Sequence, residues 1–217
     1  MAAKTSPTVR GRDAGRTREQ IFSAATKVFA KKGFDGARVD KIAAEAGVNK
    51  QLLYHHFGSK DGLFTAVLER AYENIRKQEA ALELDSLPAD EAILKLVEFT
   101  WRYYLANPDF IRLLNSENQL EARHLKGSAR TREINASHIS IAQKLIARGR
   151  REESIRRDLE VMQLNVNIAA LGFFYLMNRH TLSTVFECDL GSKRMLERRL
   201  AVIKDTIACW IRPAGKR

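Results

Sequence analysis

The stretch of sequence that decides the fold is residues 43–60, "AAEAGVNKQLLYHHFGSK". Its first helical segment stops at Gly47, because glycine readily adopts the left-handed conformation that ends many helices. Asn49 follows, and asparagine is a preferred N-cap because its side-chain oxygen accepts hydrogen bonds from helical amides. Leu53 and Phe57 then lie four residues apart, on one face of a helix. The stretch therefore predicts two short helices joined by a tight turn.

Helices are also predicted on both sides of this turn. Apolar residues recur at helical spacing through about residues 17–32, and Gly33 ends that helix. The two short helices span about residues 39–46 and 50–57, and the second has the position of the recognition helix in a helix-turn-helix. Ser59 caps a longer helix that follows them. The N-terminal part is therefore predicted to be a three-helix DNA-binding-type domain.

The rest of the chain is predicted to be helical as well. Apolar stripes at helical spacing begin after Pro88 and again after Pro108, and a further stripe lies within residues 134–145. No segment alternates apolar and polar residues as a half-buried strand does. The predicted fold class is all-α with about nine helices.

The composition is that of a globular protein. The chain has 217 residues, of which 45% are hydrophobic and 29% are charged. No apolar run approaches the ~18 residues of a membrane-spanning helix, and residues 1–16 lack the apolar segment of a signal peptide. We therefore expect a cytoplasmic protein that does not enter a membrane. Cys188 and Cys209 lie far from any second pair of metal ligands, so no metal and no cofactor is predicted.

The positive charge is concentrated near the N-terminus. Residues 1–60 contain 12 Lys and Arg against 5 Asp and Glu, whereas the rest of the chain contributes only +4 to the net charge of +11. A basic segment of this kind suits a polyanion. Charge alone leaves three interpretations open: nucleic acid, anionic lipid, or a solvated surface without a partner.

The last two predicted helices carry apolar residues at alternating steps of four and three, which is the spacing of a coiled-coil seam. The two seams can be satisfied within the chain or by the same helices of a second subunit, forming a four-helix bundle. We favour a twofold-symmetric homodimer, because Val202 and Ile211 add apolar positions beyond one stripe. Asn178 either fixes the register of its seam or is a solvated kink. The predicted interface residues are Leu164, Ile168, Leu171, Tyr175, Asn178, Leu182, Leu196, Leu200, Ile203, Ile207 and Trp210.

Residues 17–68, "TREQIFSAATKVFAKKGFDGARVDKIAAEAGVNKQLLYHHFGSKDGLFTAVL", resemble the DNA-binding domain of the TetR/AcrR family of bacterial transcriptional regulators. The resemblance has no gap and includes the "IAAEAGV" turn, the "LYHHF" helix end and the "SK" after it. It implies a ligand pocket among further helices and a dimer built on the last two. We accordingly divide the chain into a basic flexible arm (1–13), a DNA-binding domain (14–74, with the helix-turn-helix at about 38–57) and an effector-binding and dimerisation domain (75–217). The arm either follows the minor groove or is a solubilising tail.

Four residues are expected to meet base edges, because a recognition helix enters the major groove by its N-terminal end. Lys50 suits guanine, Gln51 suits adenine, and Leu52 can touch the methyl group of thymine. His55 completes the set. A metal site at His55 and His56 is not expected, because adjacent helical residues point about 100° apart. The alternative for each side chain is an ordinary solvated residue.

Phosphate contacts are implied by the resemblance. Tyr54, His56 and Lys60 match family positions that hold phosphates. Lys60 is assisted by the N-terminus of its own helix. Where Arg38 stands, the family usually has Thr or Ser, which caps the short second helix. Arg38 cannot cap through an oxygen, so we expect it to contact a phosphate while Asp35 or water supplies the cap.

The C-terminal part also contains an apolar set with a few polar groups, which is how an effector pocket is usually composed. An ordinary core with satisfied polar residues is the alternative at each position. Glu117 is the least ordinary member, because it lies on an apolar stripe and a buried carboxylate needs a partner. That partner could be His138, an arginine or a cationic effector. The candidate pocket residues are Trp101, Tyr104, Leu114, Glu117, Asn118, His138, Ile141, Phe173, Phe174 and Met177.

These features predict a homodimeric repressor that binds double-stranded operator DNA of near-palindromic sequence and is released by a small-molecule effector. A tilt of the helix after Ser59 would change the distance between the two recognition helices. An enzyme with an active site in the C-terminal domain is one alternative. Against it, the sequence shows no nucleophile-and-base arrangement, no glycine-rich phosphate loop and no cluster of metal ligands. A nonspecific nucleoid-type binder is the other, and it would not distinguish an operator from random DNA.

Overall fold

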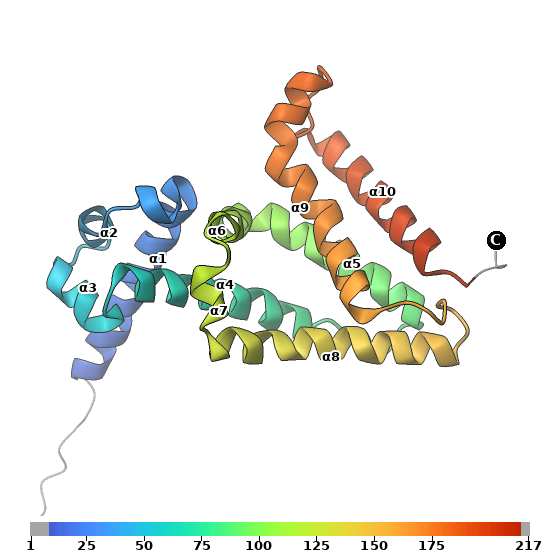
Figure 1. The fold of residues 1–217 in the computed structure, drawn as a ribbon, viewed down its shortest axis with the longest axis horizontal. Helices are drawn as coiled ribbons and strands as arrows, with labels where there is room; N and C mark the ends of the chain where they lie inside the picture. The colour runs from blue at the N-terminus through green and yellow to red at the C-terminus, as the bar shows by residue number, and fades with distance from the viewer. Residues whose placement is uncertain (1–8, 214–217) are drawn as a thin grey trace, which may run out of the picture. The chain divides into compact units, whose positions relative to one another are not determined.

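The computed structural model describes the backbone of residues 9–213 and the side chains of residues 15–213. Over this part of the chain it contains ten α-helices and no strand, which confirms the predicted all-α fold class. The chain divides into two compact units (Figure 1). Unit 1 comprises the residues up to Ala71 together with Arg112–Ala129. Unit 2 comprises Tyr72–Ile111 together with the residues from Arg130 onward.

Unit 1 is a small helical domain with a closed aromatic and aliphatic core. The rings of Phe29 and Phe64 meet edge to face at 4.8 Å in its centre. Leu53, on the predicted recognition helix, is fully buried in the same core. The unit contains α1 (Val9–Gly36), α2 (Val39–Glu45), α3 (Lys50–Phe57), the first part of α4 (Lys60–Ala80), the end of α6 (Pro108–Gln119) and α7 (Arg123–Lys126).

The caps of α3 and α4 explain why these helices begin where they do. The side-chain oxygen of Asn49 accepts a hydrogen bond from the amide of Leu52 at 2.7 Å. The Ser59 hydroxyl accepts one from the amide of Gly62 at 2.9 Å. A Cβ atom at position 62 would lie 2.3 Å from the carbonyl oxygen of Phe57, so only glycine fits this close turn. The predicted N-caps of both helices are thus confirmed.

The start of α1 differs from the prediction. The helix begins at Val9, so residues 9–13 are helical where a flexible arm was expected, and residues 1–8 lie outside the described part. The sequence missed this turn because residues 9–16 carry no apolar stripe, although arginine favours helices. At its other end, α1 is interrupted at the predicted position, since Gly33 has a non-helical φ of 68° and ψ of 177°.

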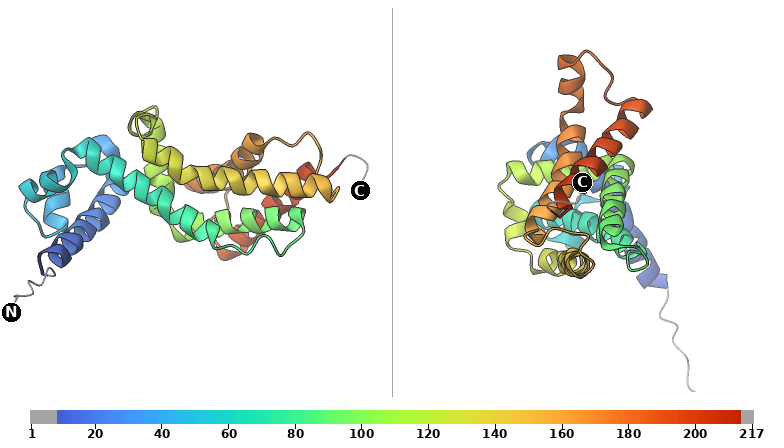
Figure 2. Two further views of the ribbon diagram at one scale, coloured as in Figure 1. Left: turned by 90° about the horizontal axis from the view of Figure 1, so that it is seen from below. Right: turned by 90° about the vertical axis from the view of Figure 1, so that its right-hand side faces the viewer.

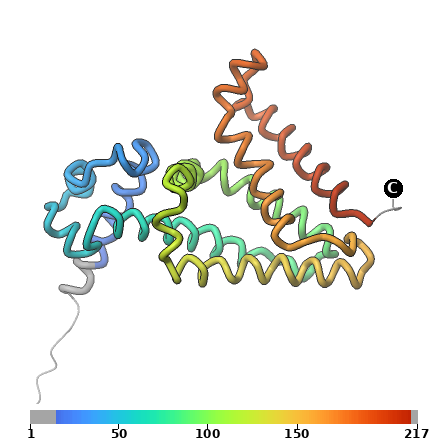
Figure 3. Tube along the Cα trace, viewed as in Figure 1, coloured from blue at the N-terminus to red at the C-terminus, as the bar shows by residue number. Residues whose placement is uncertain are grey.

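Unit 2 is built around α5 (Ala89–Ala106). It also contains the end of α4, the start of α6, α8 (Ala129–Arg151), α9 (Val161–Val185) and α10 (Lys193–Ile211). Helices α9 and α10 lie side by side, and both pack against α5, as two further views show (Figure 2). The trace in Figure 3 follows the connections from α8 through α9 to α10.

The predicted dimer seams are largely buried within unit 2 itself. Leu164, Leu200, Ile203 and Ile207 are at most 6% exposed and belong to the core that α9 and α10 form with α5. Side chains that are covered within their own chain cannot meet a second one, so the internal alternative holds for them. Ile168 and Tyr175 are buried as well, whereas the others are half-buried: Leu171, Asn178, Leu182, Leu196 and Trp210.

Asn178 forms a hydrogen bond within its own helix. Its side-chain amide donates to the carbonyl oxygen of Phe174, one turn earlier in the same helix, at 2.8 Å. A hydrogen bond within one helix carries no information about a partner helix. The register alternative for Asn178 depends on a partner helix and stays a prediction.

Helix α9 leaves large apolar side chains exposed on the face that points away from α5. Met162 is 63% exposed, Val166 52%, Phe174 61% and Val185 72%. By length and composition, α9 is also the one described helix that could cross a membrane. The sequence prediction missed this property because asparagines interrupt the apolar run. Core helices of soluble proteins meet the same criterion.

Candidate nucleic-acid interface

Helix α3 presents one polar face and buries the other. Lys50, Gln51 and His55 are exposed, Tyr54 is 38% exposed, and Leu53 is completely buried. The remaining predicted contact residues of this helix, Leu52 and His56, are half-buried. Because α2 and α3 are fixed in the core of unit 1, the polar face of α3 is held rigidly at the surface. All the predicted base-contact side chains lie on this short helix, with at least part of each accessible.

Lys50, the first residue of α3, is already engaged in the free protein. Its ammonium nitrogen lies 2.9 Å from the Asp40 carboxylate on α2 and 5.9 Å from the centre of the Tyr54 ring. The hydrogen bond from Lys50 lowers the pKa of Asp40, and the same hydrogen bond raises the pKa of Lys50. Both groups are therefore charged at neutral pH.

Arg38 occupies the N-cap position of α2, with an extended backbone (φ −104°, ψ 129°). Its side chain makes no capping hydrogen bond, as expected for a residue without a side-chain oxygen. The side chain is exposed and is free of the helix that it precedes. Arg38 is thus placed beside the helix-turn-helix as a charged, accessible group.

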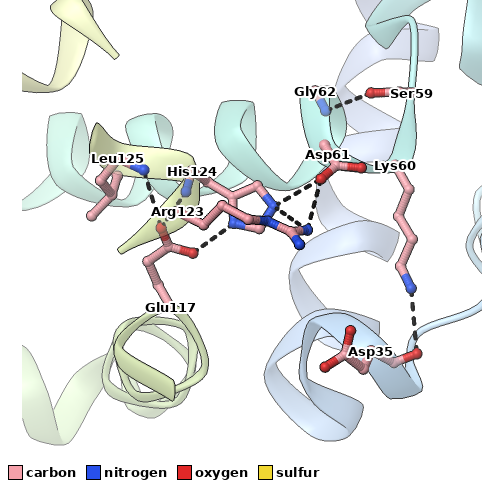
Figure 4. Close-up of polar contacts among 9 residues, drawn as sticks. All are labelled: Asp35, Ser59, Lys60, Asp61, Gly62, Glu117, Arg123, His124 and Leu125. Atoms are coloured by element: carbon pink, nitrogen blue, oxygen red, sulfur yellow. Dashed lines mark hydrogen bonds and ion pairs between the residues drawn. The ribbon is translucent and has the colours of Figure 1, made fainter. Parts of the chain in front are cut away.

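Lys60 lies at the start of α4 and is held against the end of α1 (Figure 4). Its ammonium nitrogen is 4.6 Å from the centre of the Phe34 ring and donates to the carbonyl oxygen of Asp35 at 3.4 Å. Lys60 is the first residue of α4, so its backbone lies at a helix N-terminus, which attracts anions. Lys60 and the helix terminus can therefore act together on one phosphate.

The segment from Glu117 to Leu125, far along the chain, packs against the start of α4. One oxygen of Glu117 accepts hydrogen bonds from the amides of His124 (2.7 Å) and Leu125 (3.0 Å), and the other lies 2.7 Å from Nδ1 of His124 (Figure 4). On its other side, Nε2 of His124 lies 3.3 Å from the Asp61 carboxylate on α4. Glu117 is 2% exposed, which confirms that it is a buried carboxylate with a partner. Its partner is His124, however, and not His138.

The same segment completes the end of α1. The hydroxyl of Ser116 accepts a hydrogen bond from the amide of Phe34 at 3.0 Å, directly after the break at Gly33. The rings of Phe34 and His124 lie 4.6 Å apart. The sequence alone predicts this segment to be part of the C-terminal domain, because no periodicity reveals a contact between residues so far apart in the chain.

Comparison with known proteins decides the family. The family described as "Bacterial regulatory proteins, tetR family" matches residues 21–67. The one described as "Tetracyclin repressor-like, C-terminal domain" matches residues 90–207, which is more than half of the chain. The chain belongs to the TetR family. It is therefore a DNA-binding transcriptional regulator, as its exposed recognition helix indicates.

One relative matches nearly the whole length of the chain, and another matches about half of it. The HTH-type transcriptional repressor NicS of Pseudomonas putida is 36% identical over 197 residues, which are 91% of this chain and 93% of NicS. The repressor SCO4008 of Streptomyces coelicolor is 40% identical over 103 residues, 48% of this chain and 50% of its own.

Solved structures show the same fold. The regulator SCO4942 from Streptomyces coelicolor has a TM-score of 0.69 at 22% identity, over 90% of this chain and 98% of its own. FadR from Bacillus subtilis, in complex with stearoyl-CoA, has a TM-score of 0.66 at 18% identity, over 89% and 99%. At these identities the likeness concerns the fold alone.

The candidate effector residues of this TetR-family protein fall into both units. Leu114, Glu117 and Asn118 belong to unit 1, and Asn118 is exposed. His138, in unit 2, contacts the buried carboxylate of Glu79 at 2.7 Å and is thereby satisfied within the chain. Phe174 is mostly exposed on α9. The structure therefore does not bring the predicted set together as one lining within either unit.

Trp101 and Tyr104 are the buried members of that set in unit 2. They are 1% and 6% exposed, and both rings lie against Gly172 on α9, where a Cβ atom would be in van der Waals contact with each at 3.4 Å. Burial raises the pKa of Tyr104 to about 12. Among the described residues, the indole N–H of Trp101 has no acceptor. Ile141, Phe173 and Met177 are half-buried in the same unit.

A hollow of about 580 Å³ lies elsewhere in unit 2. It is formed by the segment between α8 and α9 together with the end of α10, and none of the predicted pocket residues lines it.

The side chains of His55 and His56 lie 5.6 Å apart between ring centres. In the part of the chain that the structure describes, no group of three or more His, Cys, Asp and Glu could hold a metal ion.

Proposed function

We propose that the chain is a homodimeric, cytoplasmic repressor that binds a near-palindromic operator through α3 and is released when a small molecule binds in unit 2. The observation that carries the proposal is the face of α3, where Lys50, Gln51 and His55 are exposed opposite the buried Leu53. A short helix held in this way at a domain surface fits the major groove. The repressor function of NicS, which matches nearly the full chain, supports the direction of control.

The contacts with DNA divide into two classes. Lys50 and Gln51, with Leu52 and His55, read base edges from the first turns of α3, because these are the positions that enter the groove. Tyr54, His56, Lys60 and Arg38 hold phosphates on either side. The phosphate contacts position the domain, whereas the base contacts discriminate between sequences.

The dimer forms through the exposed side of α9 and α10. Met162, Val166 and Phe174 follow one another along α9, and Val202 on α10 is 47% exposed. An apolar surface of this extent on a soluble protein is typical of an interface. A second copy covers it by twofold symmetry and places two recognition helices on successive turns of one DNA face.

The effector binds around Trp101 and Tyr104. Burying an indole N–H without an acceptor is unfavourable, so a ligand that supplies one would bind with a gain in free energy. We therefore propose a ligand with an apolar body and at least one hydrogen-bond acceptor. Because α4 runs from unit 1 into unit 2, ligand binding beside its second half can change the position of the first.

Footprinting on the DNA that flanks its own gene tests operator binding, and we expect a protected palindrome at moderate salt. Two variants then test the division of roles. Lys50→Ala should change base preference, whereas Lys60→Ala should weaken binding to all sequences alike and reduce the salt slope by about one unit. Equal losses on all sequences from both variants would contradict this division, and the absence of any protected site would contradict operator binding.

A further inference from the structure

The pair between Lys50 and Asp40 connects the two helices of the helix-turn-helix. Lys50 is the first residue of α3, and Asp40 lies in the first turn of α2. Their charged atoms are 2.9 Å apart, and the two side chains are 48% and 59% exposed. A pair this exposed contributes little to stability. Its position at the entry of the recognition helix suggests another role.

Asp40 lies among positive charges. Arg38 precedes it and acts electrostatically on both Asp40 and Lys50. The other acid on α2, Glu45, faces Lys41 at 3.9 Å and does not touch the recognition helix. Asp40 is thus an acid placed directly against a base-reading lysine, at a surface that must approach a polyanion.

Phosphates and base edges make different demands on this pair. A phosphate that approaches Lys50 also approaches the exposed Asp40 carboxylate, and the two negative charges repel each other. An ammonium group has three donors, however, so Lys50 can donate to the O6 or N7 of guanine and keep its bond to Asp40. Asp40 therefore opposes backbone contacts by Lys50 while it permits base contacts.

We propose that Asp40 determines specificity: it holds Lys50 for base edges and suppresses the binding of nonoperator DNA. This inference rests on the proposed operator binding by α3 and deepens it. Asp40 acts through Lys50 as a positioning residue, and specificity arises in part from a repulsive element against the wrong partner.

The test measures binding of the full-length protein to two duplexes of equal length, the footprinted operator and a scrambled sequence, over a series of salt concentrations. For Asp40→Asn we expect tighter binding to the scrambled duplex, by roughly tenfold near 0.1 M salt, with a salt slope steeper by about one unit. Operator affinity should change much less. The ratio between the two affinities should therefore fall.

Glu45→Gln is the matched control, because it removes one acidic charge from the same helix without touching α3. It should shift both duplexes by a similar factor and leave the ratio unchanged. Asp40→Glu should retain the ratio of the natural protein. In a Lys50→Ala background, Asp40→Asn should no longer affect the ratio. Circular dichroism confirms that each variant is folded.

The outcomes separate this inference from the function on which it rests. If the natural protein binds both duplexes equally, the proposed operator binding fails. If it discriminates and Asp40→Asn keeps the full ratio, only the role of Asp40 is overturned. An equal fall in the ratio for Asp40→Asn and Glu45→Gln, or a fall that persists without Lys50, would also overturn it, because the effect would then be one of net charge.

Discussion

The two units differ in what they leave exposed. Among the described side chains of unit 1, Tyr54 is the one exposed large hydrophobic residue, and it lies on the proposed DNA surface. Unit 2 leaves seven exposed, from Ile139 through Val202, and most of them lie on or near α9. Unit 1 thus buries nearly all its large apolar side chains within one chain, and we propose that it acts through its polar surface. Unit 2 leaves apolar side chains of α9 exposed, and this is the face that we propose a second copy covers.

This difference teaches where each function is encoded. The proposed DNA-binding surface depends on a few side chains of one short, continuous segment. The proposed dimer depends on the side of α9 that the chain itself does not cover, which no single segment specifies. Substitutions in the two units should therefore differ in kind: changes in unit 1 should act on local stability and DNA binding, whereas changes on α9 should act on assembly.

The largest effect is expected from breaking the apolar face of α9. Replacing both Val166 and Phe174 with Asp places charges where a second copy would bury side chains worth roughly 1.5–3 kcal/mol each. We expect a folded monomer in sedimentation velocity at micromolar concentration, with operator affinity lower by at least roughly 100-fold because two half-sites are no longer bound together.

The matched control for this pair is Ile139→Asp, which alters an exposed apolar residue on α8 (46% exposed). This variant should remain dimeric. A monomeric Ile139 variant together with a dimeric Val166 and Phe174 variant would place the interface on α8 and contradict our assignment.

The next largest effect concerns the buried support of unit 1. Glu117→Ala leaves two amides and the His124 imidazole without their acceptor, and loss of a buried charged partner costs about 3–5 kcal/mol. Native-state hydrogen exchange of the buried amides of unit 1 should report this loss. Glu197→Ala in unit 2 is the control, because its partner Arg102 is exposed and its loss should change little. Equal effects of the two substitutions would show that the Glu117 contacts do not persist in solution.

The sequence predicted unit 1 well where the signals are local. Gly47, Asn49 and Ser59 each act within a few residues of their own position, so the limits of α2, α3 and α4 could be read from the sequence. The support by α6 and α7 could not. The bond between Phe34 and Ser116 joins residues 82 positions apart, and helical periodicity identifies an apolar face without naming its partner.

In unit 2 the sequence pattern identified residues that are buried, but it did not identify what they contact. The heptad spacing marks Leu164, Leu200 and Ile203, and all three are indeed buried. The pattern leaves open whether a second chain or the same chain covers them, and α5 does so here. Conversely, the sequence places Phe174 in the apolar set of the candidate pocket, whereas the structure leaves it 61% exposed on α9.

A smaller effect is expected at the cap of the recognition helix. Asn49→Ala removes the oxygen that accepts from the amide of Leu52, at a cost of about 1 kcal/mol. Exchange of the α3 amides should become faster, while that of α9 should not change. Asn49→Asp keeps an acceptor and should restore the protection. If Asn49→Ala leaves the exchange of the α3 amides unchanged, the cap does not contribute to the stability of the recognition helix.

The smallest effect on stability is expected at Arg38. A substitution there should stabilise the fold and weaken DNA binding. This residue begins α2 without a capping bond, so Arg38→Ser should add one and stabilise unit 1 by about 0.5–1 kcal/mol. The same change removes a charge that we place on a phosphate, so binding to all DNA sequences should weaken and the salt slope should fall by about one unit. Arg38→Lys keeps the charge without adding a cap and should leave the slope unchanged. A variant that is stabilised and binds DNA with an unaltered slope would show that Arg38 contacts no phosphate. The arginine would then need an explanation other than phosphate binding, because a hydroxyl at this N-cap position would stabilise α2 better.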